Sequence, residues 1–264
     1  MSQTATPWSG GVVTDVATCV LAPNPGLMTL DGTNTWVLLE PGSRDAVVID
    51  PGPDDEVHLQ AVLAGLHARD AVVAQILLTH RHHDHSGGAA RFAALTGAPV
   101  RALDPAYRLG SQGLGEGDVI DVGSLRLRVL ATPGHTDDSV CFELAGLLLT
   151  GDTVLGRGTT VIAYPDGQLA DYLDSLAKLQ EISGGLSLLL PGHGPVLAGP
   201  AQVLQSYLDH RVQRLEQVRQ AVAAGAVTVQ DVVAVVYADV PRALWPAAEL
   251  SVAAQLAYLT APPA

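Results

Sequence analysis

The stretch THRHHDHSGG, from Thr79 to Gly88, decides how the rest of the chain is interpreted. It places four of the nine histidines of this 264-residue chain, together with Asp84, directly after the apolar run QILL. A loop at the carboxyl end of a strand is where α/β proteins place ligands. Imidazole and carboxylate groups without a thiolate suit zinc and tolerate iron or manganese. The stretch therefore predicts a metal site at the end of a strand.

The spacing inside this stretch fits two metal ions rather than one. His80 and His82, two residues apart in a tight loop, are able to point to one side. Asp84 and His85 follow directly and are able to face the other side. One loop is thus predicted to contribute to two metal sites a few ångströms apart.

Further candidate ligands stand at matching points later in the chain. His135 follows the strand-like run LRLRVLA, Asp152 follows LLLT, and His193 follows SLLL. Each caps an apolar run and has a glycine beside it. A single histidine or aspartate at a strand end is usually a turn or surface residue. The repetition of the pattern in four segments favours a shared metal site.

The order of the apolar runs indicates an α/β layered fold. Helical patterns over residues 54–68, 88–95 and 171–182 interrupt the strand-like runs, which are ATCVLA, TWVLLE, AVVID, QILLT, LRLRVLAT, SVCFEL, LLLT and SLLL. Near residue 200 the pattern changes to one long helix over 201–224 and two shorter helical segments. We therefore expect a catalytic domain over 1–200 and a helical domain over 201–264, with PGHGPVLAGP as the hinge. Thr228, with Asp231 three residues on, is a plausible helix N-cap.

Composition limits the classes of function. A net charge of −13, with only 14 basic residues, argues against a wide nucleic-acid footprint, although it permits a local basic patch. No apolar run reaches the roughly 18 residues of a membrane span. The start MSQTATPWSGG lacks the features of a signal peptide, so we expect a cytoplasmic protein. Cys19 and Cys141 are expected to be buried free thiols.

The four segments THRHHDHSGG, TPGHTDDS, LLTGDTV and LPGHGPV resemble the metallo-β-lactamase superfamily, over residues 15–200. The resemblance implies an αββα sandwich with a dinuclear metal site at one edge. It also implies the ligand roles: His80, His82 and His135 for the first metal, Asp84, His85 and His193 for the second, and Asp152 as the bridge between them. His83 occupies the variable position of the motif, where it would face solvent or support a ligand.

Three further features resemble the β-lactamase-like protein 2 branch of that superfamily. They are NPGLMTLDGTNTWVL near the start, PGHGPV, and the helical tail after LDHRVQRLEQV. In that branch the tail resembles a reduced winged helix. Here the third helix is the last element of the pattern, so we expect no wing, which weakens the case for a nucleic-acid role.

The implied activity is hydrolysis by hydroxide held between two metal ions. The expected metal is zinc, with two Zn²⁺ per subunit, and Fe or Mn are the alternatives. Asp84 is expected to help orient that hydroxide. A bridging Asp152 disfavours an antibiotic β-lactamase. Two kinds of substrate remain: a small ester or thioester, or a phosphodiester in single-stranded RNA. The alternative to an enzyme is a metal-binding or regulatory protein that does not catalyse hydrolysis. Three roles remain open for the tail: it closes over the site, it pairs two subunits as a homodimer, or it covers the sandwich.

Other residues are candidates for supporting roles. Asn34, with Thr33, precedes a core strand and is expected near the pocket mouth. The loop that follows Asp152 is expected to bring Arg157, Thr160 and Tyr164 to the substrate, with Arg157 as an anion anchor. Partners that orient the ligand imidazoles are expected among neighbouring hydroxyl groups, namely Thr79, Ser86, Thr132, Thr136 and Thr153.

Overall fold

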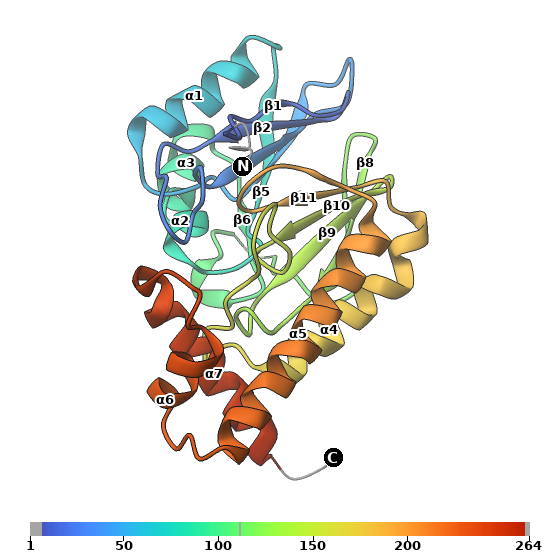
Figure 1. The fold of residues 1–264 in the computed structure, drawn as a ribbon. Coiled ribbons are helices and arrows are strands. Elements are labelled where there is room, and N and C mark those ends of the chain that lie inside the picture. Colours follow the sequence, from blue (N-terminus) through green and yellow to red (C-terminus); the bar gives the residue numbers. More distant parts are fainter. Residues whose placement is uncertain (1–6, 111, 262–264) are drawn as a thin grey trace.

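Two six-stranded sheets lie face to face, with helices on the outer side of each (Figure 1). The computed structural model describes residues 7–110 and 112–261, so the first six residues of the MSQTATPWSGG segment lie outside it. The first sheet runs in sequence order through β1 (Gly11–Val12), β2 (Ala17–Leu21), β3 (Asn34–Leu38), β4 (Asp45–Ile49), β5 (Val72–Leu77) and β6 (Val100–Arg101). The second runs through β12 (Leu197–Ala198), β11 (Leu188–Pro191), β10 (Leu147–Gly151), β9 (Val140–Leu144), β8 (Leu125–Ala131) and β7 (Val119–Val122).

Both sheets are mixed, and their parallel pairs matter most for the site. β4 pairs with β5, and β10 pairs with β11, in parallel. Each parallel pair places two carboxyl ends next to each other at one edge of its sheet. The eight predicted strand runs all form strands, whereas the short strands β1, β6, β7 and β12 were not predicted.

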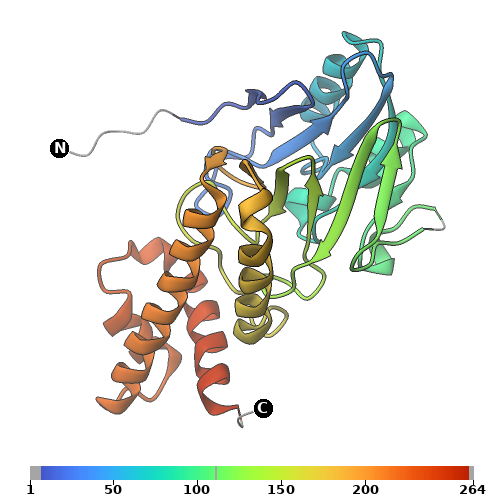
Figure 2. The same ribbon diagram turned by 90° about the vertical axis from the view of Figure 1, so that its right-hand side faces the viewer.

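Helices cover the sandwich on both outer faces (Figures 1 and 2). α1 (Glu56–His67) and α3 (Ala89–Thr96) pack on the first sheet, where Leu59 and Phe92 are fully buried. α4 (Leu169–Ile182) and α5 (Pro200–Ala223) pack on the second, with Leu176 and Leu204 in the core. Short turns complete the chain: α2 (His83–Ser86), η1 (Pro105–Tyr107) and η2 (Ser183–Gly185). The predicted αββα sandwich is confirmed.

The core between the sheets follows from alternation along the strands. In β8 the side chains of Leu125 and Leu127 point inward, while Arg126 and Arg128 are exposed. Apolar side chains from both sheets meet there, including Trp36, which is 2% exposed. Because one face of each strand is apolar, the sheets can bury that face only against each other or against a helix. Cys19 and Cys141 lie buried in these layers as free thiols, as predicted.

The long helix α5 joins the sandwich to the tail. Its first half places Leu204 and Tyr207 in the core beneath the second sheet. Its second half places Val218 and Ala221 in a separate small core with α6 (Val229–Val236) and α7 (Trp245–Thr260). The helix therefore belongs to both parts, and the domain division at residue 200 stays a prediction.

The tail is a small helical unit at one end of the sandwich (Figure 2). α6 begins with the predicted capping box, in which Thr228 accepts from the Asp231 N–H and the Asp231 carboxylate accepts from the Thr228 N–H. η3 (Arg242–Leu244) leads into α7. Between residues 229 and 261 there are helices and no strand. Within the described residues, no helix combines the length and the apolar character needed to cross a bilayer.

Candidate metal centre

Four chain segments meet at one edge of the sandwich, where strands from both sheets end. The loop after β5 carries His80 and His82, and Asp84 and His85 follow in the short helix α2. The sequence predicted this whole segment as a loop; a helical turn instead presents the last two ligands. The loops after β8, β10 and β11 bring the remaining candidates, His135, Asp152 and His193. The structure thus gathers all seven predicted ligand residues in one place.

Three histidines form the first cluster. The Nε2 atom of His80 lies 3.0 Å from Nδ1 of His82, and Nε2 of His135 lies 3.0 Å from the same Nδ1. A tetrahedral zinc ion with ligands at about 2.0–2.1 Å has ligand atoms about 3.3 Å apart. The three nitrogens therefore stand at nearly the separation that a single ion requires.

The second cluster joins Asp84, His85 and His193. Nε2 of His85 lies 3.2 Å from Nε2 of His193, and Oδ2 of Asp84 lies 3.4 Å and 3.2 Å from these two nitrogens. Asp152 lies between the clusters. Its Oδ1 is 3.5 Å from Nε2 of His85, and its Oδ2 is 3.7 Å from Nε2 of His135. This carboxylate reaches both groups of histidines, as the predicted bridge requires.

Hydrogen bonds on the far side of each ring fix which nitrogen carries the lone pair. The Nδ1 atom of His85 donates to Asp50, that of His135 to the Val161 carbonyl, and that of His193 to the Gly32 carbonyl. When a ring is neutral, its single N–H is on Nδ1, so Nε2 is the nitrogen whose lone pair can bind a cation. The same atoms face carboxylate oxygens, and Oδ1 of Asp152 is buried without a hydrogen-bond partner. Ring nitrogens and carboxylate oxygens that converge on the same points fit a cation.

Asp50, which the sequence pattern did not single out, orders the candidate ligands from behind. Its Oδ2 accepts from Thr79 Oγ1 at 2.6 Å and from His85 Nδ1 at 2.9 Å, and its Oδ1 accepts from the Thr79 N–H at 2.8 Å. Because Thr79 donates its only hydroxyl proton to Asp50, it must accept from Nδ1 of His80, 3.0 Å away. The signal was present: Asp50 ends the apolar run AVVI and has Pro-Gly beside it, as His135 and His193 do in their own segments.

Of the hydroxyl groups predicted to orient the ligands, only Thr79 bonds to a ligand side chain. Ser86 donates to the carbonyls of Arg81 and His82 and so closes the helical turn. Thr132, Thr136 and Thr153 bond to other groups behind the centre. A residue outside that prediction, Thr33, donates from Oγ1 to Oδ2 of Asp84 at 3.1 Å.

The charges at the centre separate the histidines into two kinds. Burial lowers the pKa of His80 and His135, and burial with the nearby His135 lowers that of His82 to about 4. Burial also acts on His193, but the carboxylates of Asp152 and Asp84 outweigh it and raise its pKa to about 9. The pKa of His85 is raised for the same reason. The first cluster is neutral, and the second lies in a negative potential that favours a cation.

Two predicted substrate residues lie elsewhere. Asn34 is fully buried, and its amide donates to the carbonyls of Pro191 and Gly194 at 2.9 Å each. It fastens the loop that carries His193 and does not reach the pocket mouth. Tyr164 packs against the second sheet's outer core and lines a shallow hollow next to α7. Exposed His83 points away from the cluster, as expected.

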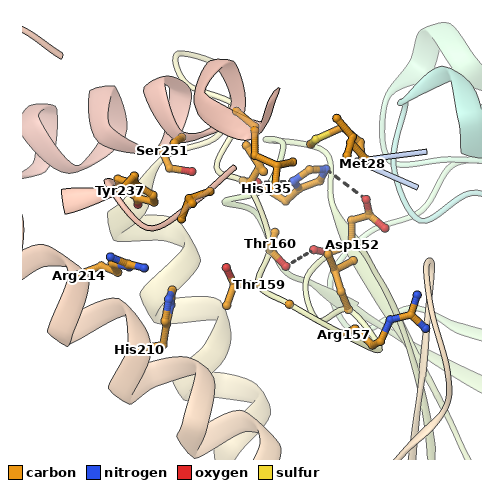
Figure 3. Close-up of a pocket in the computed structure, with 18 of the residues that line it drawn as sticks. Met28, His135, Asp152, Arg157, Thr159, Thr160, His210, Arg214, Tyr237 and Ser251 are labelled. Atoms are coloured by element: carbon orange, nitrogen blue, oxygen red, sulfur yellow. Dashed lines mark hydrogen bonds and ion pairs between the residues drawn. The ribbon is translucent and has the colours of Figure 1, made fainter. Parts of the chain in front are cut away.

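A pocket of about 310 Å³ opens from His135 and Asp152 toward the helical tail (Figure 3). The predicted loop does line it, through Arg157 and Thr160, and Thr160 donates to the Asp152 carbonyl at 2.8 Å. Arg157 also pairs with Asp31 at 2.7 Å. Most of the wall is apolar, contributed by Leu27, Met28, Leu30, Leu155, Val161, Val240, Leu244, Ala247 and Ala248.

Comparisons with known proteins agree with this geometry. The beta-lactamase-like protein 2 homolog of Drosophila melanogaster is 35% identical over 259 residues, covering 91% of this chain and 86% of that protein. An atrochrysone carboxyl ACP thioesterase of Aspergillus fumigatus is 34% identical over 206 residues, covering 75% of this chain and 62% of that protein. A beta-lactamase domain protein of Burkholderia ambifaria, at 22% identity, has the same fold, with a TM-score of 0.82 over 97% of this chain and 91% of that one.

Two family models match the chain. Residues 228–261 match the beta-lactamase associated winged helix domain, which corresponds to α6, η3 and α7. Residues 28–193 match the metallo-beta-lactamase superfamily model, a segment that contains all seven clustered side chains. With this match, the αββα sandwich and the His/Asp cluster at its edge, the chain belongs to the metallo-β-lactamase superfamily of hydrolases.

Proposed function

We propose that this protein hydrolyses esters or thioesters with an apolar acyl group, using two zinc ions, the metal that its histidine-rich donor set favours. The observation that carries the proposal is the position of the pocket. Its apolar walls begin at His135 and Asp152, so an acyl chain in the pocket would hold its carbonyl at the metal centre. Apolar pockets of a few hundred Å³ bury most of a small ligand.

His80, His82 and His135 would hold one metal ion, Asp84, His85 and His193 the other, and Asp152 would bridge the two. When bound, such a pair of ions supplies a water of lowered pKa and polarises the carbonyl oxygen. The protein supplies fixed ligands: Asp50, Val161 and Gly32 accept from Nδ1 of the rings and so leave Nε2 as the nitrogen that would face the metal.

Asp84 is the proposed catalytic carboxylate. Its Oδ2 faces His85 and His193 and accepts from Thr33. Its Oδ1 has no hydrogen-bond partner among the described residues and is able to accept a proton from the attacking water. Burial would raise the pKa of Asp84, but the neighbouring His85 and His193 outweigh it and lower that pKa, so the group is ionised at neutral pH.

The similarity to a thioesterase supports an acyl substrate. The second candidate is a phosphodiester in single-stranded RNA. It is favoured by the winged-helix match of the tail and by the arginines that line the pocket, Arg157, Arg211 and Arg214. The net charge of −13 and the mainly apolar lining of the pocket favour the acyl substrate instead.

The test compares substrates on one zinc-loaded preparation. Octanoyl-pantetheine, a single-stranded RNA oligonucleotide and a chromogenic β-lactam are assayed side by side, with His82→Ala as the blank and His83→Ala as the matched control. We expect octanoyl-pantetheine to be hydrolysed by the wild type and by His83→Ala, but not by His82→Ala. Cleavage of RNA alone would replace the acyl substrate with the second candidate.

A further inference from the structure

The wall of the pocket that α5 to α7 contribute carries a group of basic side chains. His210, Arg211 and Arg214 on α5 line it, with Tyr237 at the end of α6 and Ser251 on α7 (Figure 3). The guanidinium groups of Arg211 and Arg214 form no ion pair with a carboxylate of the described residues. By contrast, Arg157, which also lines the pocket, pairs with Asp31. In a chain with a net charge of −13, such an unpaired basic group is unexpected.

Arg211 gives the strongest evidence that this wall of the pocket lacks an anionic partner. The residue is 3% exposed, and its Nε atom is buried without a hydrogen-bond partner. One of its other nitrogens donates to the Thr160 carbonyl, and the guanidinium lies 4.8 Å from the centre of the Tyr172 ring. A buried guanidinium without an anion loses most of its hydration energy. The geometry therefore leaves a donor and a positive charge unsatisfied.

Arg214 and His210 extend the group toward the pocket space. Arg214 uses Nη1 to donate to the Val236 carbonyl at 2.8 Å and to Gln217 at 3.0 Å, and it stacks 4.6 Å from the centre of the Tyr237 ring. These contacts hold the guanidinium in place, while its other N–H groups have no hydrogen-bond partner in the described chain. The Nδ1 atom of His210 is buried and also without a partner. Burial, with the charges of Arg211 and Arg214, lowers the pKa of His210 to about 4.

We propose that this basic group binds an anionic oxygen group, a carboxylate or a phosphate, that the substrate carries at a distance from the bond to be hydrolysed. Guanidinium groups are suited to bind such anions through paired hydrogen bonds. The apolar part of the pocket wall would receive the intervening carbon chain. The inference deepens the proposed hydrolase function and rests on it, since it names the acidic character of the substrate.

Kinetics with matched substrates test the inference. Octanoyl-pantetheine, suberoyl-pantetheine and octanoyl-phosphopantetheine differ only in a terminal carboxylate on the acyl group or a phosphate on the thiol side. We expect Arg214→Gln to raise KM for one of the charged substrates by about ten- to a hundred-fold, the usual range for losing a charged hydrogen bond. The rise for octanoyl-pantetheine should be several times smaller. Arg219→Gln, on the exposed side of the same helix, should leave all three values unchanged.

The charged substrate that responds identifies the source of the anion. An equal change for neutral and charged substrates, or no change, would overturn the proposal. A binding measurement distinguishes failure of this proposal from failure of the proposed hydrolase function. If no thioester is hydrolysed, the affinities of the zinc-loaded wild type, Arg214→Gln and Arg219→Gln for suberate and for phenyl phosphate are measured by calorimetry. A ten-fold or greater loss confined to Arg214→Gln would sustain the subsite, and equal affinities would remove it.

Discussion

At the scale of the residue, the centre depends on side chains that point away from the metal positions as much as on those that face them. Asp50 contacts both Thr79 and His85, which are 29 and 35 residues away in the sequence. The ligands themselves could be predicted, because four similar segments repeat one pattern. A single aspartate before Pro-Gly looks like an ordinary turn residue, and only the fold shows its partners.

Asp50→Asn should weaken metal binding while the fold is retained. The amide would place an N–H against Nδ1–H of His85 or against Thr79, so one of the two contacts becomes unfavourable. Changes of this kind behind a metal ligand cost about 10–100-fold in metal affinity or activity. Zinc titration with a competing chelator measures the loss, and Asp45→Asn at the exposed start of β4 is the matched control. Unchanged zinc affinity in Asp50→Asn would show that Asp50 does not orient the ligands.

Asn34 was predicted to have a role in the pocket that the structure does not show. A polar GTNT segment before a core strand looks like a pocket rim, yet the Asn34 amide bonds to two carbonyls of the His193 loop. Its neighbour Thr33 is the residue that contacts a candidate ligand. One position along an extended chain reverses the direction of a side chain, and the sequence did not decide which of the two faces the site.

At the scale of the element, the regular patterns were predictable and the irregular ones were not. Alternation in β8 and the apolar spacing of α4 and α5 follow from which face is buried. The strands β1, β6 and β12 have two residues each, too few to show a period. The turn α2 has four residues, HDHS, and none of them is apolar, so it shows no apolar periodicity.

Thr228→Ala should destabilise the tail by removing the N-cap of α6. The Thr228 hydroxyl accepts from the Asp231 N–H at 3.1 Å, and loss of such a cap costs about 0.5–2 kcal/mol. Urea denaturation followed by circular dichroism measures the change, with Gln230→Ala on the exposed side of α6 as the control. Equal unfolding free energies for the two variants would mean that the capping box contributes nothing to stability.

At the scale of the whole molecule, the candidate ligands come from both sheets. The β5 loop and α2 extend from the first sheet, and the loops of His135, Asp152 and His193 extend from the second. Metal ions at this edge would join the two halves of the sandwich. The sequence predicted the site and the layers, but the pocket between the sandwich and the tail arises from how α5 to α7 pack, which no local pattern encodes.

Removing the metal should therefore lower the stability of the whole sandwich. A ligand present at about 100 times its Kd stabilises the folded state by about 2.7 kcal/mol. We expect thermal unfolding to begin several degrees lower after treatment with a chelator, and to recover when zinc is added back. The shift should be smaller in Asp152→Ala, which has lost the carboxylate between the clusters. An identical melting temperature with and without chelator would argue against metal ions at this edge.

The most direct measurement is the metal content of the purified, zinc-dialysed protein, determined by mass spectrometry on the wild type, His82→Ala, Asp152→Ala and His83→Ala. We expect about two zinc ions per chain in the wild type and in His83→Ala, and fewer in the other two variants. A wild type that holds no metal, or a His83→Ala protein that loses as much as His82→Ala, would contradict the assignment of the cluster as a dinuclear metal centre.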